Sequence, residues 1–378
     1  MKDERTPERD ADLARALRFL SAVPLVDGHN DLPFLIRRDA GGDVARYDLR
    51  HRQARRDTDL PRLRAGRVAG QVWAAFVPPR EPQPASFALA QIALVRRMCE
   101  LHADAFHFAT SADDVLEAHA ANRIASFVSI ENGAAIENRL DTLDAFHALG
   151  VRLITLCHNA TTDWCDSATD APRHNGLTSF GRDVIERMNR LGILVDLAHT
   201  SDDVMRQALE TSRAPVVFSH SNARALCDHR RNVPDDVLAI ARQRGAVVMA
   251  TFVPDFISQR SKDWLTPFRD AYGKLREDID ANLAVEARER EAGRWPRGTL
   301  HQYCDHVDYL RAKMGEDGVG IGSDFFGGPQ GVGLEDASCF PHIVAELFAR
   351  GWSEPDMEKL VSGNFLRVLR EVEQEADR

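Results

Sequence analysis

Side chains that can bind metal ions or transfer protons follow short apolar runs at six places in this chain. Each run has the length and composition of a buried parallel strand. The polar residues that end or follow the runs are His29 with Asp31, Glu131, His158, His199, His220 and Asp324. Such residues at the carboxyl ends of several strands are typical of the active site of an α/β barrel. The pattern therefore predicts one catalytic centre built from many strands.

The spacing of five of these residues predicts a metal site. His29 and Asp31 are separated by one residue. On a strand, side chains at i and i+2 point to the same face, so both can reach one ion. His199 and His220 end the fifth and sixth predicted strands, which are neighbours in a barrel, and can converge on a second ion. Glu131 ends the third strand and could bridge the two ions. Imidazole and carboxylate ligands suit Zn²⁺, with Mn²⁺ or Co²⁺ as substitutes.

The bridging role of Glu131 follows partly from what the chain lacks. Many two-metal barrel hydrolases use a carboxylated lysine as the bridge, but no lysine lies between Lys2 and Lys262. Glu131 is the remaining candidate, and the alternative is a glutamate that flanks the Asn132–Gly133 turn and caps a helix. Five ligands leave coordination open for water. Two ions about 3.5–4 Å apart can hold a hydroxide that attacks a substrate carbonyl.

The elements that must position these residues alternate between strands and amphipathic helices. We predict strands near 23–30, 68–77, 124–131, 151–158, 193–199, 214–220, 245–252 and 318–324. Alternation with helices implies right-handed βαβ units and a parallel sheet. Eight such units imply a closed (β/α)₈ TIM barrel of the metal-dependent hydrolase type. A dinucleotide-binding fold is the rival, but no GxGxxG turn follows the first strand.

The chain is expected to form one catalytic domain over residues 23–370. An N-terminal helical arm is expected over 1–22 and a frayed tail over 371–378. The connections 32–67 and 253–317 are too long for simple crossovers. Long connecting segments in a barrel usually cover the end that carries the active site or contact another subunit. The charged half of the second connection could equally be a solvated helix.

Composition excludes several classes of protein. The 378 residues are 44% hydrophobic and 28% charged, which is ordinary for a soluble globular protein. The net charge of −10 argues against binding nucleic acid. The charged amino terminus lacks the apolar core of a signal peptide, and no run approaches the roughly 18 apolar residues that span a bilayer. Six cysteines without a CxxC pair argue against a disulfide framework or a zinc finger. We therefore expect a cytoplasmic protein with no membrane partner.

Several segments together resemble the membrane (renal) dipeptidases and their bacterial relatives, over roughly residues 24–370. These segments are ValAspGlyHisAsnAspLeuPro (26–33), SerIleGluAsnGly (129–133), LeuThrSerPheGlyArg (177–182), ValAspLeuAlaHisThrSer (195–201), PheSerHisSerAsnAla (218–223), ArgArgAsnValProAspAsp (230–236), GlyAlaValValMetAla (245–250), GlyIleGlySerAspPhe (320–325) and GlyAsnPheLeuArgVal (363–368). The combination is specific, whereas any one segment alone is weak.

The resemblance implies a zinc-dependent barrel peptidase that cleaves dipeptides and forms a homodimer. Carried over by position, His29 and Asp31 resemble the ligands of one zinc ion. His199 and His220 resemble the ligands of the other, and Glu131 resembles the bridge.

The resemblance also implies roles for three further residues. His158 matches the histidine near the scissile carbonyl, Arg231 the arginine that holds the substrate carboxylate, and Asp324 the acid–base carboxylate. Each role is chemically reasonable: Asp324 can pass a proton from the attacking hydroxide to the leaving amine, and His158 can steady an oxyanion. The planar fork of Arg231 suits a carboxylate. The alternatives are a core histidine bonded to backbone at 158 and a shared role for Arg230.

The residues and the resemblance together predict a binuclear zinc dipeptidase. Two other readings stay open, namely a metal-dependent hydrolase of another amide (β-lactam-like or N-acyl amino acid) and a non-catalytic barrel. The preferred dipeptides, and whether a D-residue is accepted at the C-terminal side, are not legible in the sequence.

Overall fold

The computed structural model describes residues 7–54, 56–271, 284, 287–326 and 328–376. Its strands all pair in parallel, in the order β1-β2-β4-β5-β6-β7-β8-β9, while β3 pairs with β4 outside this path. The strands are β1 Leu25–Asn30, β2 Val68–Phe76, β3 Phe106–Phe108, β4 Ile124–Glu131, β5 Val151–Thr155, β6 Leu194–Asp196, β7 Val217–Phe218, β8 Val247–Ala250 and β9 Val319–Ile321.

The last strand of the path returns to the first. Asn30 and Phe325 form an isolated parallel bridge just beyond β9. The Asp31 N–H donates to the Phe325 carbonyl at 2.8 Å, and the Asp324 N–H donates to the His29 carbonyl at 3.1 Å. The eight strands of the path therefore form a nearly closed parallel barrel, and the predicted α/β barrel is confirmed.

The predicted strand windows each contain one strand of this path, but several strands are shorter than their windows. β6 ends at Asp196 and β7 at Phe218, so His199 and His220 lie in the loops that follow. β3 was not predicted. It is three residues long and only Phe106 is buried, so it has no apolar run to reveal it.

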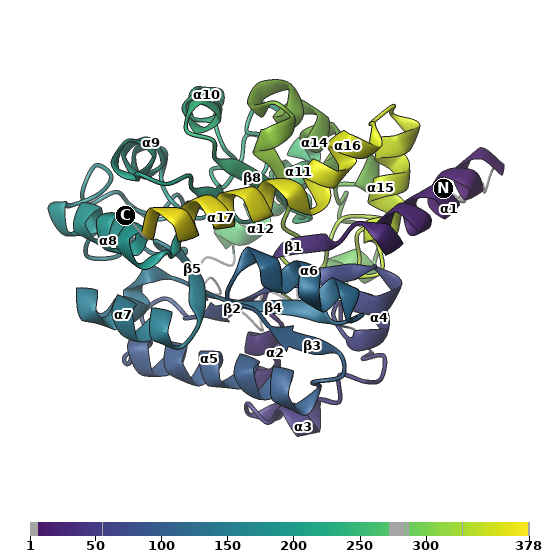
Figure 1. Cartoon of the computed structure of the whole chain (residues 1–378). Helices are drawn as coiled ribbons and strands as arrows, with labels where there is room; N and C mark the ends of the chain where they lie inside the picture. Colours follow the sequence, from purple (N-terminus) through teal and green to yellow (C-terminus); the bar gives the residue numbers. More distant parts are fainter. Residues whose placement is uncertain (1–6, 55, 272–283, 285–286, 327, 377–378) are drawn as a thin grey trace.

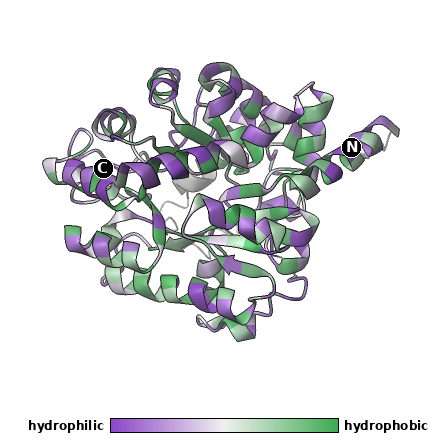
Figure 2. Ribbon diagram, viewed as in Figure 1, coloured by the Kyte–Doolittle hydropathy of each residue, from purple (hydrophilic) through white to green (hydrophobic). Residues whose placement is uncertain are grey.

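Helices surround the barrel (Figure 1). Among the described residues they are α1 Pro7–Ala22, α2 Leu32–Ala40, α3 Val44–Tyr47, α4 Leu60–Ala65, α5 Pro84–Leu101, α6 Ala112–Ala120, α7 Leu140–Ala148, α8 Ser179–Leu191, α9 Asp202–Thr211, α10 Asp235–Gln243, α11 Pro254–Ile257, α12 Gln259–Ala271, α14 Leu300–Met314, α15 Phe340–Ala349, α16 Glu354–Glu358 and α17 Asn364–Ala376. Figure 2 shows mainly hydrophobic strands inside and mixed, partly hydrophilic helices outside. No helix in the described part of the chain combines the length and apolar character needed to cross a membrane.

Local sequence signals explain where individual helices begin and end. Ser111 and Asp114 form a reciprocal capping box at the start of α6. α8 ends at Leu191, and its C-cap residue Gly192 has a φ of 72°, in the left-handed region that glycine adopts without strain. These signals set the lengths of the helices that carry the chain from one strand to the next.

The first and last helices of the described residues, α1 and α17, both bury apolar side chains. On α1, Leu20 is buried, and the Phe19 ring lies 5.5 Å from the Phe348 ring of α15. At the other end, the frayed tail expected over 371–378 overlaps the last helix of the described residues. α17 continues to Ala376 and buries Val372, because its apolar face extends that far. Residues 377–378 lie outside the described residues.

Both long connections carry helices. The connection 32–67 contains α2, α3 and α4, and 253–317 contains α11, α12 and α14. Within the second connection, residues 272–283 and 285–286 lie outside the described residues. The end of its charged half is anchored, since the Trp295 indole N–H donates to Ser261 Oγ at 2.8 Å.

Candidate metal centre

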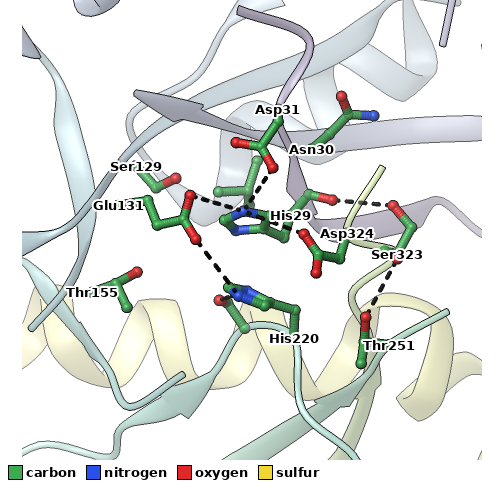
Figure 3. A network of polar contacts seen from close by, with 12 residues as sticks. His29, Asn30, Asp31, Ser129, Glu131, Thr155, His220, Thr251, Ser323 and Asp324 are labelled. Atoms are coloured by element: carbon green, nitrogen blue, oxygen red, sulfur yellow. Dashed lines mark hydrogen bonds and ion pairs between the residues drawn. The ribbon is translucent and has the colours of Figure 1, made fainter. Parts of the chain in front are cut away.

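Glu131, the last residue of β4, lies between the two predicted ligand pairs. Its Oε2 is 3.6 Å from His29 Nε2, while its Oε1 is 3.0 Å from His199 Nε2 and 3.7 Å from His220 Nε2. Figure 3 shows His29 and His220 facing different oxygens of this carboxylate. The capping alternative does not hold, because Asn132 Oδ1 accepts the Ala134 N–H in the following turn. One buried carboxylate therefore faces both pairs.

The first pair converges, although not for the reason the spacing suggested. His29 Nε2 lies 3.5 Å from Asp31 Oδ2. Asp31, however, is past the end of β1 and is the residue before α2, and the pairing of β1 with β2 is irregular between Asp27 and Asn30. The two side chains meet through a turn at the strand end and not through regular strand alternation.

The second pair presents two ring nitrogens to each other. His199 Nε2 and His220 Nε2 are 3.0 Å apart. The opposite nitrogens face oxygens: His199 Nδ1 lies 3.1 Å from Asn159 Oδ1, and His220 Nδ1 lies 2.7 Å from Ser219 Oγ. If each ring carries its proton on Nδ1, the lone pair of each ring is on Nε2. The two Nε2 lone pairs and the Glu131 carboxylate then point at one another. Such a cluster repels itself unless a cation lies among its atoms, so these residues fit a divalent metal ion.

Burial supports the same conclusion. Both ring nitrogens of His29 and Oδ1 of Asp31 are buried, and none has a hydrogen-bond partner among the described residues. Unpaired buried polar atoms are rare and often mark an ion site. Burial also lowers the pKa of His199 and of His220 well below the usual range, with the Arg231 charge adding to the shift for each ring. Both rings are therefore neutral at pH 7, the form that binds metals.

Asp324 faces the first pair from the loop after β9. Its Oδ1 lies 3.9 Å from His29 Nε2. Burial raises the pKa of Asp324 to about 7, with the Asp31 and Glu131 charges adding to the shift and the His29 charge opposing it. A carboxyl group with such a pKa can both accept and release a proton near neutrality. The backbone is unusual at Asp324 and His199, whose φ angles of 61° and 67° lie in the left-handed region. Strained backbone of this kind clusters at functional sites.

His158 faces Glu131 from the loop after β5. Its Nε2 lies 3.6 Å from Glu131 Oε1, and its ring centroid is 4.2 Å from that of His199. Its Nδ1 has no hydrogen-bond partner within the described residues, which argues against a core histidine bonded to backbone. Burial, and then the Arg231 charge, lower the pKa of His158 to about 3, so the ring is neutral.

Arg231 is a buried cation beside the cluster. It is 2% exposed, whereas Arg230 is exposed. Its guanidinium makes only long hydrogen bonds, at 3.4 Å to Ser221 Oγ and 3.3 Å to the His220 carbonyl. In the described part of the chain it forms no ion pair with a carboxylate. A buried charge without a partner is costly, so this guanidinium fits an anionic group of a ligand.

Sequence reasoning missed several residues that support the cluster. Six are buried polar side chains that lie inside or beside apolar strands, namely Asp27, Gln71, Thr155, Asp196, Ser219 and Ser323, and the seventh is the exposed Asn159. A charged residue within an apolar strand is an unusual event that sequence alone can flag. Asp27 and Asp196 could have been singled out on this ground.

Comparison with known proteins gives the same family from sequence and from structure. Residues 13–378 match the membrane dipeptidase family, peptidase family M19. Dipeptidase 3 of Rattus norvegicus is 38% identical over 370 residues, which cover 95% of this chain and 67% of that protein. The chain thus spans about two thirds of the length of that relative.

Solved structures agree. The probable dipeptidase PvdM from Pseudomonas aeruginosa superposes with a TM-score of 0.82 and 26% identity, covering 98% of this chain and 100% of that one. A metallo peptidase from Rhodobacter sphaeroides, liganded with a phosphinate mimic of the dipeptide L-Ala-D-Ala, has a TM-score of 0.77 and 26% identity, covering 93% and 99%. The family expected from the sequence is confirmed: this chain belongs to peptidase family M19, the membrane dipeptidases, and is an enzyme of the metallo-dipeptidase type.

Proposed function

We propose that this enzyme hydrolyses dipeptides with two zinc ions, one bound by His29 and Asp31 and the other by His199 and His220, with Glu131 as the bridge. The observation that supports this proposal most strongly is the position of Glu131, whose two oxygens face different histidines. When bound, such ions supply a nucleophile from water at neutral pH and polarise the substrate carbonyl.

The remaining side chains move the proton and stabilise charge. Asp324 takes the proton released during attack and returns it to the leaving amine, for which its raised pKa is suited. Neutral His158 donates a hydrogen bond to the oxyanion that develops on the substrate carbonyl. Asp324 approaches His29, whereas His158 approaches Glu131 Oε1.

Arg231 restricts the substrate. Its buried guanidinium binds the free C-terminal carboxylate of the substrate, and this interaction selects short peptides. A D-residue at the C-terminal side is included in the proposal, because the related Rhodobacter enzyme binds a mimic of L-Ala-D-Ala.

Metal removal tests the proposal directly. Chelation should abolish cleavage of dipeptides, and Zn²⁺ should restore it at two ions per chain, measured by elemental analysis on the sample used for the assay. The Glu131→Gln variant keeps the shape of the side chain but loses the bridging charge, so it should bind less zinc and lose activity. Full dipeptidase activity in a metal-free sample would rule the proposal out.

A second candidate substrate follows from the same arginine. N-acyl amino acids and β-lactam-like amides also carry a carboxylate, so Arg231 accommodates them as well as a dipeptide. Comparing hydrolysis of Ala-Ala with that of N-acetyl-alanine separates the two, because only the dipeptide has a free amine. A preference for the acetylated substrate would replace the dipeptidase assignment with an acylase.

A further inference from the structure

A buried carboxylate behind the metal centre has all its acceptor positions filled. Asp196, the last residue of β6, is 0% exposed. Its Oδ1 accepts the N–H of Ser219 at 2.8 Å and the N–H of Ala198 at 3.0 Å. Its Oδ2 accepts the hydroxyl of Ser219 at 2.7 Å and the hydroxyl of Thr155 at 2.5 Å. Four donors converge on this group, so it is an ionised carboxylate that can only accept.

This arrangement fixes the direction of the next hydrogen bond. Ser219 Oγ lies 2.7 Å from Asp196 Oδ2 and also 2.7 Å from His220 Nδ1. A hydroxyl has one proton, and Asp196 can only accept, so the proton of Ser219 points to Asp196. Ser219 Oγ must then accept from His220, whose Nδ1 carries a proton whether the ring is neutral or charged. In the neutral ring, the lone pair is therefore on Nε2.

We propose that Asp196 is a positioning residue that fixes the tautomer of His220 through Ser219 and so keeps Nε2 free to bind a metal ion. Nε2 is the nitrogen that faces His199 and Glu131. The metal-binding half of this inference rests on the proposed function, whereas the tautomer does not depend on any metal.

Asp196 also has a structural role, which a test must distinguish from its effect on the tautomer of His220. β6 and β7 share a single register pair, Asp196 with Val217, so the two bonds to Ser219 add to a short backbone ladder. Loss of activity in an Asp196 variant would therefore not distinguish a tautomer effect from a weakened barrel.

The chain contains a matched control for this ambiguity. Asp27 on β1 accepts the N–H of Ser323 at 2.7 Å and its hydroxyl at 2.6 Å, and Ser323 directly precedes Asp324 as Ser219 precedes His220. The second neighbour of Ser323 Oγ, however, is the backbone carbonyl of His29 at 3.0 Å, and not a ring nitrogen. Asp27→Asn thus weakens an equivalent strand contact without a route to the tautomer of His220.

The test variant is Asp196→Asn. Its amide oxygen must stay at the Oδ1 position to accept the N–H groups of Ser219 and Ala198, which places the amide NH₂ at the Oδ2 position. The NH₂ donates to Ser219 Oγ, so the serine hydroxyl turns to donate to His220 Nδ1. The ring proton moves to Nε2, and this nitrogen can no longer bind a metal ion.

¹⁵N NMR of metal-free protein that carries ¹⁵N-labelled histidine reports the tautomer directly. The His220 signals are assigned as those that disappear in the His220→Gln variant. We expect Nδ1–H in the wild type and in Asp27→Asn, and Nε2–H in Asp196→Asn. Zinc affinity, measured by competition with a chelator, should fall about 10- to 100-fold in Asp196→Asn. An Nε2–H tautomer in the wild type, or an unchanged Nδ1–H tautomer in Asp196→Asn, would overturn the inference.

Two further outcomes are informative. If Asp196→Asn does not fold, Ser219→Ala replaces it: His220 Nδ1 then loses its only hydrogen-bond partner among the described residues, so we expect a mixture of tautomers. A pure Nδ1–H tautomer in that variant contradicts the inference. If the wild type has the expected tautomer but binds no zinc, the proposed function fails while the assignment of Asp196 as the residue that sets the tautomer stands.

Discussion

Arg231→Met should greatly weaken cleavage of substrates that have a free C-terminal carboxylate. The guanidinium is 2% exposed, so a carboxylate bound to it is removed from water together with it. Removing one partner of a buried, hydrogen-bonded charge pair costs about 2–5 kcal/mol. At about 1.4 kcal/mol for each factor of ten, kcat/KM for a dipeptide should fall between about 30-fold and about 4,000-fold.

The fold should tolerate this substitution. Methionine is unbranched and apolar, and it replaces a buried cation that has no carboxylate partner in the described residues. Replacing such a charge with an apolar side chain is often neutral or stabilising. The matched control is Arg230→Met, because Arg230 is the adjacent residue and is exposed. We expect that control to change stability by no more than about 0.5 kcal/mol and to leave kcat/KM near the wild-type value.

The assay compares Ala-Ala with its C-terminal amide, by chromatographic measurement of released alanine. The wild type should strongly prefer the acid, and Arg231→Met should lose this preference by lowering kcat/KM for the acid alone. Equal loss for both substrates in Arg231→Met, with unchanged thermal stability, would refute carboxylate recognition by Arg231. A large loss of preference in Arg230→Met would transfer the role to the exposed neighbour.

Three further substitutions test the site and the fold. Asp324→Asn should retain zinc but lower kcat by about 10²- to 10⁴-fold, because an amide cannot accept the proton; full activity would remove Asp324 from the mechanism. Leu20→Ala should lower the free energy of unfolding by about 2–5 kcal/mol in a urea titration, since Leu20 is 1% exposed; a neutral result would show that α1 contributes little to the barrel. Gly322→Ala should fold poorly or lose zinc, because an added Cβ would lie 1.8 Å from the Ser219 carbonyl oxygen; wild-type stability and zinc content would contradict this close approach.

The barrel was predictable because each of its strands is an apolar run that is followed by polar or turn-forming residues. Eight such runs, separated by amphipathic helices, are compatible with few folds other than a (β/α)₈ barrel. β3 escaped this reasoning because Phe106–Phe108 is short and only its first residue is buried. The length of α17 was hard to predict for a different reason: charged residues dominate its last turns, while Val372 continues its buried face. The homodimer and the cytoplasmic location stay predictions.

The convergence of the candidate residues at one end of the barrel was also predictable, but their conformations were not. Residue type and position at a strand end placed Glu131 between the histidines. Nothing in the local pattern indicates the left-handed φ of His199 or Asp324, because these angles are imposed by the surrounding structure and not preferred by the residues. The sequence likewise did not decide which of Arg230 and Arg231 is the candidate for carboxylate binding. Which of the two is buried depends on the path of the whole loop.

The hydrogen bonds behind the centre were the least visible in the sequence. Five side chains of the candidate centre lie beyond the ends of their strands, where the regular backbone pairing has stopped; they are Asp31, His158, His199, His220 and Asp324. Residues in such positions need other contacts to hold them, and here buried aspartates accept both donors of a serine that lies just after the neighbouring strand. The partners are 23 residues apart in one case and 296 in the other. Periodicity describes one segment at a time, so contacts between segments, and the proton positions that they set, become visible only once the barrel brings the strands together.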